Sequence, residues 1–153
     1  VMKGYKDMPE QTAEAFAGGW LHTGDVGKLD EDGFLYIVDR TKDMIVTGGF
    51  NVFPREVEDV MATHEAVAQV VVIGVPDEQW GEAVKAVVVL KPGFEGDDDL
   101  VQSMQALVKE AKGSVQSPKS IDFTDAIPLT PVGKPDKKAV RAQYWEGAGR
   151  GVG

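Results

Sequence analysis

Cysteine is absent from the 153-residue chain, and histidine occurs only twice. The missing cysteines exclude disulfide bonds and thiolate metal sites, and they are compatible with the reducing cytoplasm in which we expect the protein to work. The two histidines, His22 and His64, lie far apart, and neither stands at metal-ligand spacing from acidic residues. We therefore expect no metal site formed by the protein alone.

Long apolar runs and clusters of positive charge are also missing. No stretch approaches the roughly 20 apolar residues of a membrane span, and the first residues lack the apolar segment of a signal peptide. The formal net charge of −9 disfavours nucleic acids and anionic membranes, because those partners select clustered lysine and arginine. We expect neither a nucleic-acid partner nor a transmembrane segment. Because the chain opens on Val1, we also expect it to be a piece of a longer protein.

The remaining composition, 42% hydrophobic and 27% charged, is typical of a globular protein, and several segments predict strands. Asp32-Gly33, between "VGKL" and "FLYIVDR", has the turn chemistry of a β-hairpin. Two β-branched runs, "AVAQVVVIGV" and "EAVKAVVVL", predict buried strands. The loop that joins them carries Pro76, Trp80 and Gly81. A shorter strand is predicted around residues 121–123.

Helical periodicity appears in four segments. A short helix is predicted within residues 7–20, and a second begins at Pro54 with an apolar face that reaches His64. A third lies within residues 97–113, where three aspartates favour the helix N-terminus, and a last one follows at 137–145. Strands and helices do not alternate strictly, so the sequence predicts an α+β fold. We expect a small β-hairpin unit, followed by a short, mostly antiparallel sheet packed with helices.

The stretch "PLTPVGKPDKKAVR" at residues 128–141 places one lysine between two prolines. Pro131 and Pro135 restrict the backbone on both sides and predict an extended loop, while Gly133 allows a tight bend. Lys134 is thus expected on a stiff loop. Its ammonium would gain about 4 kcal/mol beside a phosphate at an effective dielectric constant near 20. The alternative is an ordinary solvated lysine, as most lysines are.

Four motifs occur in a fixed order along the chain. They are "GWLHTGD" at 19–25, "YIVDRTKDMIVTGGFNVFPREVE" at 36–58, "VPDEQWGEAVKAVVVL" at 75–90, and the lysine stretch. Together they resemble the C-terminal part of the adenylate-forming enzymes, which include acyl-CoA synthetases, peptide-synthetase adenylation domains and firefly luciferase. The general character is most similar to that of the fatty acyl-CoA ligases.

The resemblance implies a domain organisation and a reaction. Residues 1–41 would be the end of a large N-terminal domain, 42–146 a mobile C-terminal domain, and 147–153 a flexible tail. The reaction would join a small-molecule carboxylic acid to CoA through an acyl-adenylate, with ATP and its Mg²⁺. The missing N-terminal domain would supply the phosphate loop and the acyl pocket, so we expect the chain alone to be inactive.

The resemblance also assigns residues to the nucleotide and to the hinge. Asp25 would accept hydrogen bonds from the ribose hydroxyls of ATP, for which an ionised carboxylate is suited. Its alternative is the capping of a turn. Arg40 would add donors to the same ribose, or form a surface ion pair with Asp39 or Asp43. Lys42 falls at the hinge position of the family, or is simply a linker residue.

The remaining assignments concern the two half-reactions. In one pose Lys134 would approach the α-phosphate and the acyl carboxylate. In the other, Gly48 and Gly49 would let the pantetheine arm of CoA pass close to the backbone, although a plain tight turn needs glycine equally. Trp80 would lie near the CoA nucleotide, or be partly buried in the core. Lys119 would help to neutralise the CoA phosphates.

Several interpretations remain open at this point. Lys137, Lys138 and Arg141 are expected to be helix-surface charges rather than site residues. The chain could also belong to a peptide-synthetase adenylation domain, whose thiol acceptor is a tethered carrier. A non-catalytic module that binds CoA or a carrier protein is a further alternative. Oxidation of the luciferase type is demanded by none of these residues.

Overall fold

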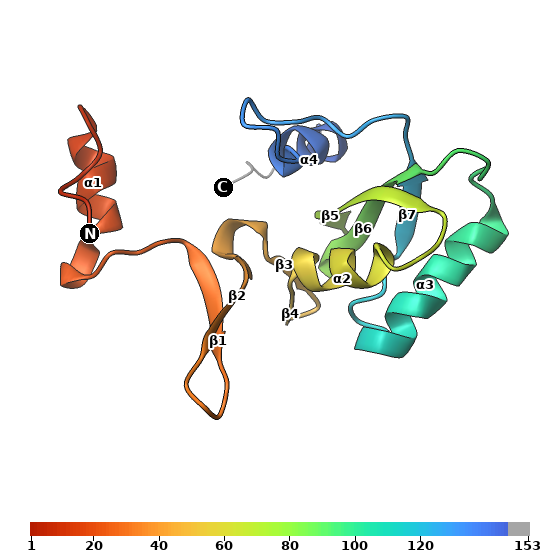
Figure 1. Cartoon of the computed structure of the whole chain (residues 1–153), viewed down its shortest axis with the longest axis horizontal. Coiled ribbons are helices and arrows are strands. Elements are labelled where there is room, and N and C mark those ends of the chain that lie inside the picture. The colour runs from red at the N-terminus through yellow and green to blue at the C-terminus, as the bar shows by residue number, and fades with distance from the viewer. Residues whose placement is uncertain (147–153) are drawn as a thin grey trace. The chain divides into compact units, whose positions relative to one another are not determined.

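The structure, a computed structural model, describes residues 1–146 (Figure 1). The chain divides into two compact units, Val1–Lys42 and Asp43–Gly153. The sequence-based boundary between residues 41 and 42 lies one residue from this division. The assignment of the first unit to a larger N-terminal domain stays a prediction. The tail predicted at 147–153 lies outside the described residues.

The first unit contains a short helix and the predicted β-hairpin. Its elements are α1 (Pro9–Ala15), the 3-10 turn η1 (Ala17–Gly19), β1 (Asp25–Leu29) and β2 (Leu35–Arg40), followed by the 3-10 turn η2 (Thr41–Asp43). The strands are antiparallel. Asp30 closes their turn, because its Oδ1 accepts hydrogen bonds from the N–H groups of Asp32 and Phe34. Gly33 supplies the positive φ of 84° that this turn requires.

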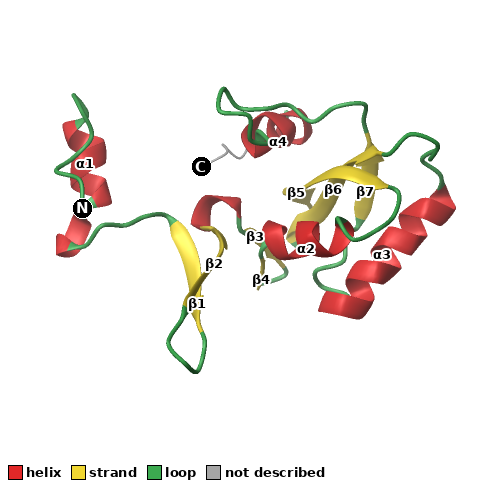
Figure 2. Ribbon diagram, viewed as in Figure 1, coloured by secondary structure: helices red, strands yellow, loops and turns green. Residues whose placement is uncertain are grey.

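The second unit is a five-stranded sheet covered by three helices (Figure 2). Its elements are β3 (Ile45–Thr47), β4 (Phe50–Val52), α2 (Pro54–Met61), β5 (Val67–Asp77), β6 (Gly81–Leu90), α3 (Asp98–Lys112), β7 (Ser120–Phe123) and α4 (Lys137–Trp145). The order is β4-β3-β6-β5, and β7 pairs with β6 in parallel. The α+β prediction of a mostly antiparallel sheet with helices is confirmed.

The two long strands extend further than predicted. They pair from Val67 with Leu90 to Asp77 with Gly81, so that only residues 78–80 form the turn. The wider loop predicted to include Pro76 and Gly81 was therefore wrong. Proline is tolerated in this strand because β5 lies at the edge of the sheet, where a missing N–H group interrupts no second ladder.

A short hairpin that the sequence analysis did not predict lies between residue 43, where the second unit begins, and α2. Strands β3 and β4 have three residues each and pair from Ile45 with Val52 to Thr47 with Phe50. Gly48 and Gly49 connect them with φ values of 56° and 82°. Two successive positive φ angles are typical of the tight turns that match the twist of a hairpin.

Apolar side chains cover both faces of the sheet, because successive residues of a strand point to opposite sides. The larger cluster lies between the sheet and α2 and α3; its buried members are Ile45, Val52, Val57, Met61, Ala66, Val67, Val72, Val84, Ala86, Val88, Met104, Val108 and Ile121. The smaller cluster lies beneath α4 and contains Val71, Ile73, Val87, Ile127 and Val140. Helix α2 ends at Met61, so the predicted extension to His64 was wrong.

Candidate functional site

The lysine loop, residues 128–136, is a closed loop rather than an extended one. Leu129 and Pro135 form an isolated antiparallel bridge. Within it, the N–H of Thr130 donates to the carbonyl of Lys134 at 2.7 Å, and the N–H of Gly133 donates to the carbonyl of Thr130 at 2.8 Å. Pro131 occupies the second position of this four-residue turn, which its fixed φ favours. The predicted bend at Gly133 is present, with φ of 78°.

Thr130 is the residue that the sequence analysis missed. Besides its main-chain bonds, its hydroxyl accepts a hydrogen bond from the N–H of Lys134 at 3.2 Å. Threonine followed by proline and glycine is a signal for such a side-chain-closed turn. The backbone of Lys134 is thus held at both its N–H and its carbonyl, while its side chain is exposed. Within residues 1–146, the Lys134 ammonium has no ion-pair partner.

Helix α4 follows the loop directly and is attached by polar contacts to helix α2 and to strand β6. Asp136 caps the helix by accepting from the N–H of Ala139 at 3.0 Å. Lys137 pairs with Glu58 at 2.9 Å, and Arg141 pairs with Glu82 at 2.6 Å. The side chains of Lys137 and Arg141 are only 21% and 20% exposed. The prediction that these two are surface charges was therefore wrong, because both reach back into the domain.

The C-terminal end of α4 adds a third polar contact. The hydroxyl of Tyr144 donates to Asp122 Oδ2 at 2.7 Å, and the Lys85 ammonium lies 2.8 Å from Asp122 Oδ1. Burial alone would raise the pKa of Asp122, but its bonds to Lys85 and Tyr144 outweigh burial and lower the pKa. Burial and the nearby Asp122 carboxylate together raise the pKa of Tyr144 to about 12. Helix α4 is therefore fixed by charge at several points.

The glycine turn, Gly48 and Gly49, lies beside Trp80. The N–H of Gly48 donates to the carbonyl of Trp80 at 2.9 Å. A Cβ atom on Gly48 would lie 2.5 Å from Cε3 of the indole ring, so no larger residue fits there without displacing the ring. Trp80 is 47% exposed, so about half of its surface is covered by the domain. The glycine turn and the Trp80 indole together form one exposed surface at the N-terminal end of β6.

Lys119 lies directly before β7. Its N–H donates to the carbonyl of Val84 on β6 at 2.8 Å. Its side chain lines a cavity of about 440 Å³ together with Lys109 and Ser114. Since Val84 is three residues from Gly81 on the same strand, Lys119 lies roughly 10 Å along β6 from the end at which Trp80 stands.

Asp25 and Arg40 are brought together in the first unit. They are direct partners in the β1–β2 ladder, and Arg40 Nε lies 3.3 Å from Asp25 Oδ1. Arg40 does form a surface ion pair, but with the other predicted ribose residue rather than with Asp43. Lys42 is exposed in η2, directly before the division between the two units. The hinge role of Lys42 stays a prediction.

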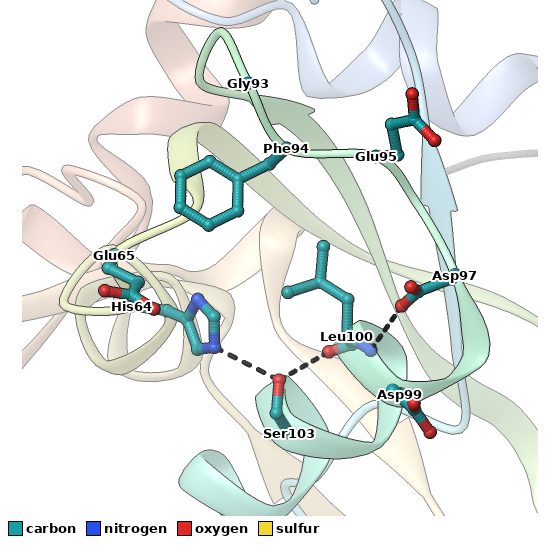
Figure 3. A pocket seen from close by; sticks show the side chains of 9 residues that line it. All are labelled: His64, Glu65, Gly93, Phe94, Glu95, Asp97, Asp99, Leu100 and Ser103. Carbon is teal, nitrogen blue, oxygen red and sulfur yellow. Dashed lines mark hydrogen bonds between the residues drawn. The ribbon is translucent and has the colours of Figure 1, made fainter.

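A second cavity, of about 560 Å³, is lined by His64 and by none of the candidate site residues (Figure 3). The Nε2 atom of His64 lies 3.1 Å from Ser103 Oγ. The Ser103 hydroxyl in turn donates a hydrogen bond to the carbonyl of Leu100. The cavity is also lined by four acidic residues: Glu65, Glu95, Asp97 and Asp99. In the described part of the chain, no three histidine or acidic side chains are placed to hold a metal ion. His64 is satisfied locally, as expected.

The family model for the AMP-binding enzyme C-terminal domain matches residues 56–134. The chain belongs to this family. Its sequence is 63% identical to the medium/long-chain-fatty-acid–CoA ligase FadD8 of Mycobacterium tuberculosis and 48% identical to the long-chain-fatty-acid–CoA ligase of Bacillus subtilis. These alignments cover 98% and 88% of this chain, but only 27% and 23% of the two relatives. The chain thus spans about a quarter of their length.

Solved structures agree with the AMP-binding C-terminal assignment. The amide bond synthetase McbA of Marinactinospora thermotolerans matches with a TM-score of 0.83 and 44% identity, over 94% of this chain and 28% of that one. Because it covers 94% of this chain, the match extends beyond residues 56–134. None of the helices among residues 1–146 is long and apolar enough to cross a bilayer.

Proposed function

We propose that this chain is the mobile C-terminal part of a longer acyl-CoA ligase, which we call the complete ligase. It would convert a carboxylic acid, ATP and CoA into acyl-CoA, AMP and pyrophosphate through an acyl-adenylate. The observation that carries the proposal is the exposed ammonium of Lys134 on a closed loop, in a domain of the AMP-binding enzyme family. The names of the two ligases that it resembles support fatty acids as the acyl substrate.

In the first half-reaction, Lys134 stabilises charge as the carboxylate attacks the α-phosphate and pyrophosphate leaves. Because the loop is closed by Thr130, the ammonium is presented without the entropy cost of ordering a flexible segment. An interaction of about 4 kcal/mol that exists only in the transition state corresponds to roughly a thousandfold in rate. Asp25 and Arg40 bind the ribose, exchanging their mutual ion pair for contacts with its hydroxyls.

In the second half-reaction, the domain rotates about Lys42 and the glycine turn faces the acyl-adenylate. The open backbone at Gly49 has no atom within 4 Å of where a Cβ would stand, which leaves space for the pantetheine arm. Trp80 contacts the CoA nucleotide, and Lys119 contacts a CoA phosphate. Magnesium would be brought into the site by ATP. The cytoplasm is the proposed site of action.

The decisive experiment measures the two half-reactions of the complete ligase separately. Lys134→Ala should lower ATP–pyrophosphate exchange about a thousandfold and leave thioester formation from a supplied acyl-adenylate nearly unchanged. Lys138→Ala is the matched control, because it removes an exposed lysine four residues away on α4. Equal losses in both half-reactions would show that Lys134 is structural. Exchange by the present chain alone would contradict the need for a missing N-terminal domain.

A different acceptor is the second candidate. The similarity to an amide bond synthetase indicates that this domain occurs with acceptors other than CoA. A peptide-synthetase adenylation domain or a carrier-binding module would also preserve the glycine turn and Trp80. Titration of the complete ligase with CoA and with a phosphopantetheinylated carrier protein, followed by product analysis, separates these cases. Saturation by CoA at a lower concentration than by the carrier supports the ligase.

A further inference from the structure

Glu82, near the start of β6, is a largely buried carboxylate whose two oxygens serve different elements. Its Oε2 accepts a hydrogen bond from the N–H of Val46 on β3 at 2.9 Å. Its Oε1 accepts from Nη2 of Arg141 on α4 at 2.6 Å. The side chain is 17% exposed, so both bonds are formed with little competition from water. One carboxylate therefore joins a short strand to a helix across β6.

Each partner leads directly to one of the two proposed functional loops. Val46 stands two residues before Gly48, at the entrance to the glycine turn. Arg141 lies on the helix that continues the lysine loop, seven residues after Lys134. The path from Glu82 to the glycine turn runs along β3, and the path from Glu82 to the lysine loop runs along the first residues of α4. Both paths are short and pass only through regular secondary structure. A displacement of Glu82 would consequently be transmitted to both loops.

The surroundings leave this carboxylate little freedom. Gly74 on β5 faces it, and a Cβ at that position would lie 3.0 Å from both Cδ and Oε2 of Glu82. The Trp145 indole donates to the carbonyl of Gly74 at 3.0 Å, and the Arg141 guanidinium lies 4.8 Å from the Trp145 ring centre. Nε of Arg141 is buried without a hydrogen-bond partner in the described structure, so the guanidinium depends on Glu82.

We propose that Glu82 is a positioning residue that holds the lysine loop and the glycine turn at a fixed spacing. The inference rests on the proposed function, because that function assigns one loop to each half-reaction. A carboxylate is required, since both of its neighbours are donors and only an acceptor on each side satisfies them. A glutamine at this position would satisfy one donor and present its own N–H groups to the other.

The test is Glu82→Gln in the complete ligase, with both half-reactions measured well below the melting temperature. We expect each half-reaction to fall on the order of tenfold or more, because small misplacements of reacting groups are costly. Lys134→Ala, in contrast, should affect only the first. Glu56→Gln is the matched control: it breaks a comparable ion pair with Lys112, 3.0 Å long, between α2 and α3. It should leave both rates unchanged.

Hydrogen–deuterium exchange gives a second readout that needs no activity. In Glu82→Gln, the amides of residues 46–50 and of residues 129–135 should both exchange faster, on the order of tenfold. Neither segment should change in Glu56→Gln. Glu82→Asp, which keeps the charge but shortens the reach, should resemble Glu82→Gln rather than the wild type.

The outcomes separate this inference from the proposed function. A lower melting temperature with wild-type half-reactions and unchanged exchange in both segments would reduce Glu82 to a purely structural residue and overturn the inference. Faster exchange in only one segment would also overturn it, because the two loops would then be independent. If the wild-type complete ligase forms neither adenylate nor thioester, the proposed function fails, whereas the exchange experiment still decides whether Glu82 couples the segments.

Discussion

The two faces of the sheet are stabilised in different ways. The face under α2 and α3 is closed by the larger apolar cluster, whose packing is strong but has little directional preference. The face under α4 has the smaller cluster, supplemented by ion pairs and hydrogen bonds at Glu82 and Asp122, and Lys137 of α4 also pairs with Glu58 of α2. Hydrogen bonds and ion pairs are directional, so they define where α4 lies. The face that carries the lysine loop is thus the one whose contacts fix the position of its helix, α4.

The difference has an energetic side as well. Buried ion pairs contribute little net stability, because the cost of removing two charges from water offsets their attraction. Apolar burial contributes most of the free energy of unfolding. We therefore expect stability to depend mainly on the α2–α3 face and placement mainly on the α4 face. Substitutions on the two faces can be compared directly.

The largest effect should follow truncation of the α2–α3 face. Met104→Ala removes a fully buried side chain from α3 and should lower the free energy of unfolding by about 2 to 5 kcal/mol. Val140→Ala, the equivalent truncation on α4, should lower it by roughly 1.5 to 3 kcal/mol, because fewer methyl groups leave the smaller cluster. Urea unfolding of this chain measures both.

The comparison needs a control on the same helix. Gln102→Ala changes an exposed position of α3 and should stay within about 0.5 kcal/mol of the wild type. If Val140→Ala proves more destabilising than Met104→Ala, the apolar asymmetry between the faces is contradicted. Faster exchange of the lysine loop should accompany Val140→Ala but not Met104→Ala.

A smaller effect is expected when a single polar contact on the α4 face is removed. Tyr144→Phe keeps the ring and deletes the hydroxyl that donates to Asp122, so it should cost about 1 kcal/mol. Tyr5→Phe is the control, since its half-exposed side chain lies in the first unit. Urea unfolding would detect the difference. A neutral Tyr144→Phe would mean that Lys85 alone holds Asp122.

The features that could be predicted from the sequence are those set by local pattern, not those set by contacts between distant residues. Features set by local pattern were recognised: the hairpin at Asp32-Gly33, the two long strands, and the last helix at its observed bounds of residues 137–145. The β3–β4 hairpin was not, because three-residue strands carry little periodicity and depend on pairing with β6. The sites of Glu58 and Glu82 were also missed, because their α4 partners are many residues away in the sequence.

In the candidate site, too, local features were predicted and contacts between distant residues were not. The sequence predicted a loop with a bend at Gly133 around Lys134, but it did not predict the contact between Gly48 and Trp80. It did not reveal that Thr130 closes that loop, nor that Arg141 is anchored by Glu82. The Arg141–Glu82 contact depends on tertiary packing, which no spacing of residue types encodes, whereas the Thr130 turn has a local signal in the proline and glycine that follow it. Sequence patterns therefore identified the chemical groups better than the means of holding them.

The smallest predicted effects concern the dependence of stability on pH. One contribution is lost at low pH and the other at high pH. Because the pKa of Asp122 is lowered in the folded chain, its contribution to stability is present above the ordinary aspartate pKa, near 4, and is lost as the pH falls further. Because the pKa of Tyr144 is raised to about 12, its contribution is present below pH 10 and is lost as the pH rises from 10 to 12.

Urea midpoints measured across both pH ranges test these contributions against the apolar face. In Tyr144→Phe the loss between pH 10 and 12 should be smaller than in the wild type, since the titrating hydroxyl is gone. The acid loss should also shrink, because Asp122 has one bond fewer, while Lys85 still lowers its pKa. Met104→Ala should shift all midpoints downward without changing either slope, because apolar burial does not titrate. A changed acid slope in Met104→Ala would show that the two faces do not act independently.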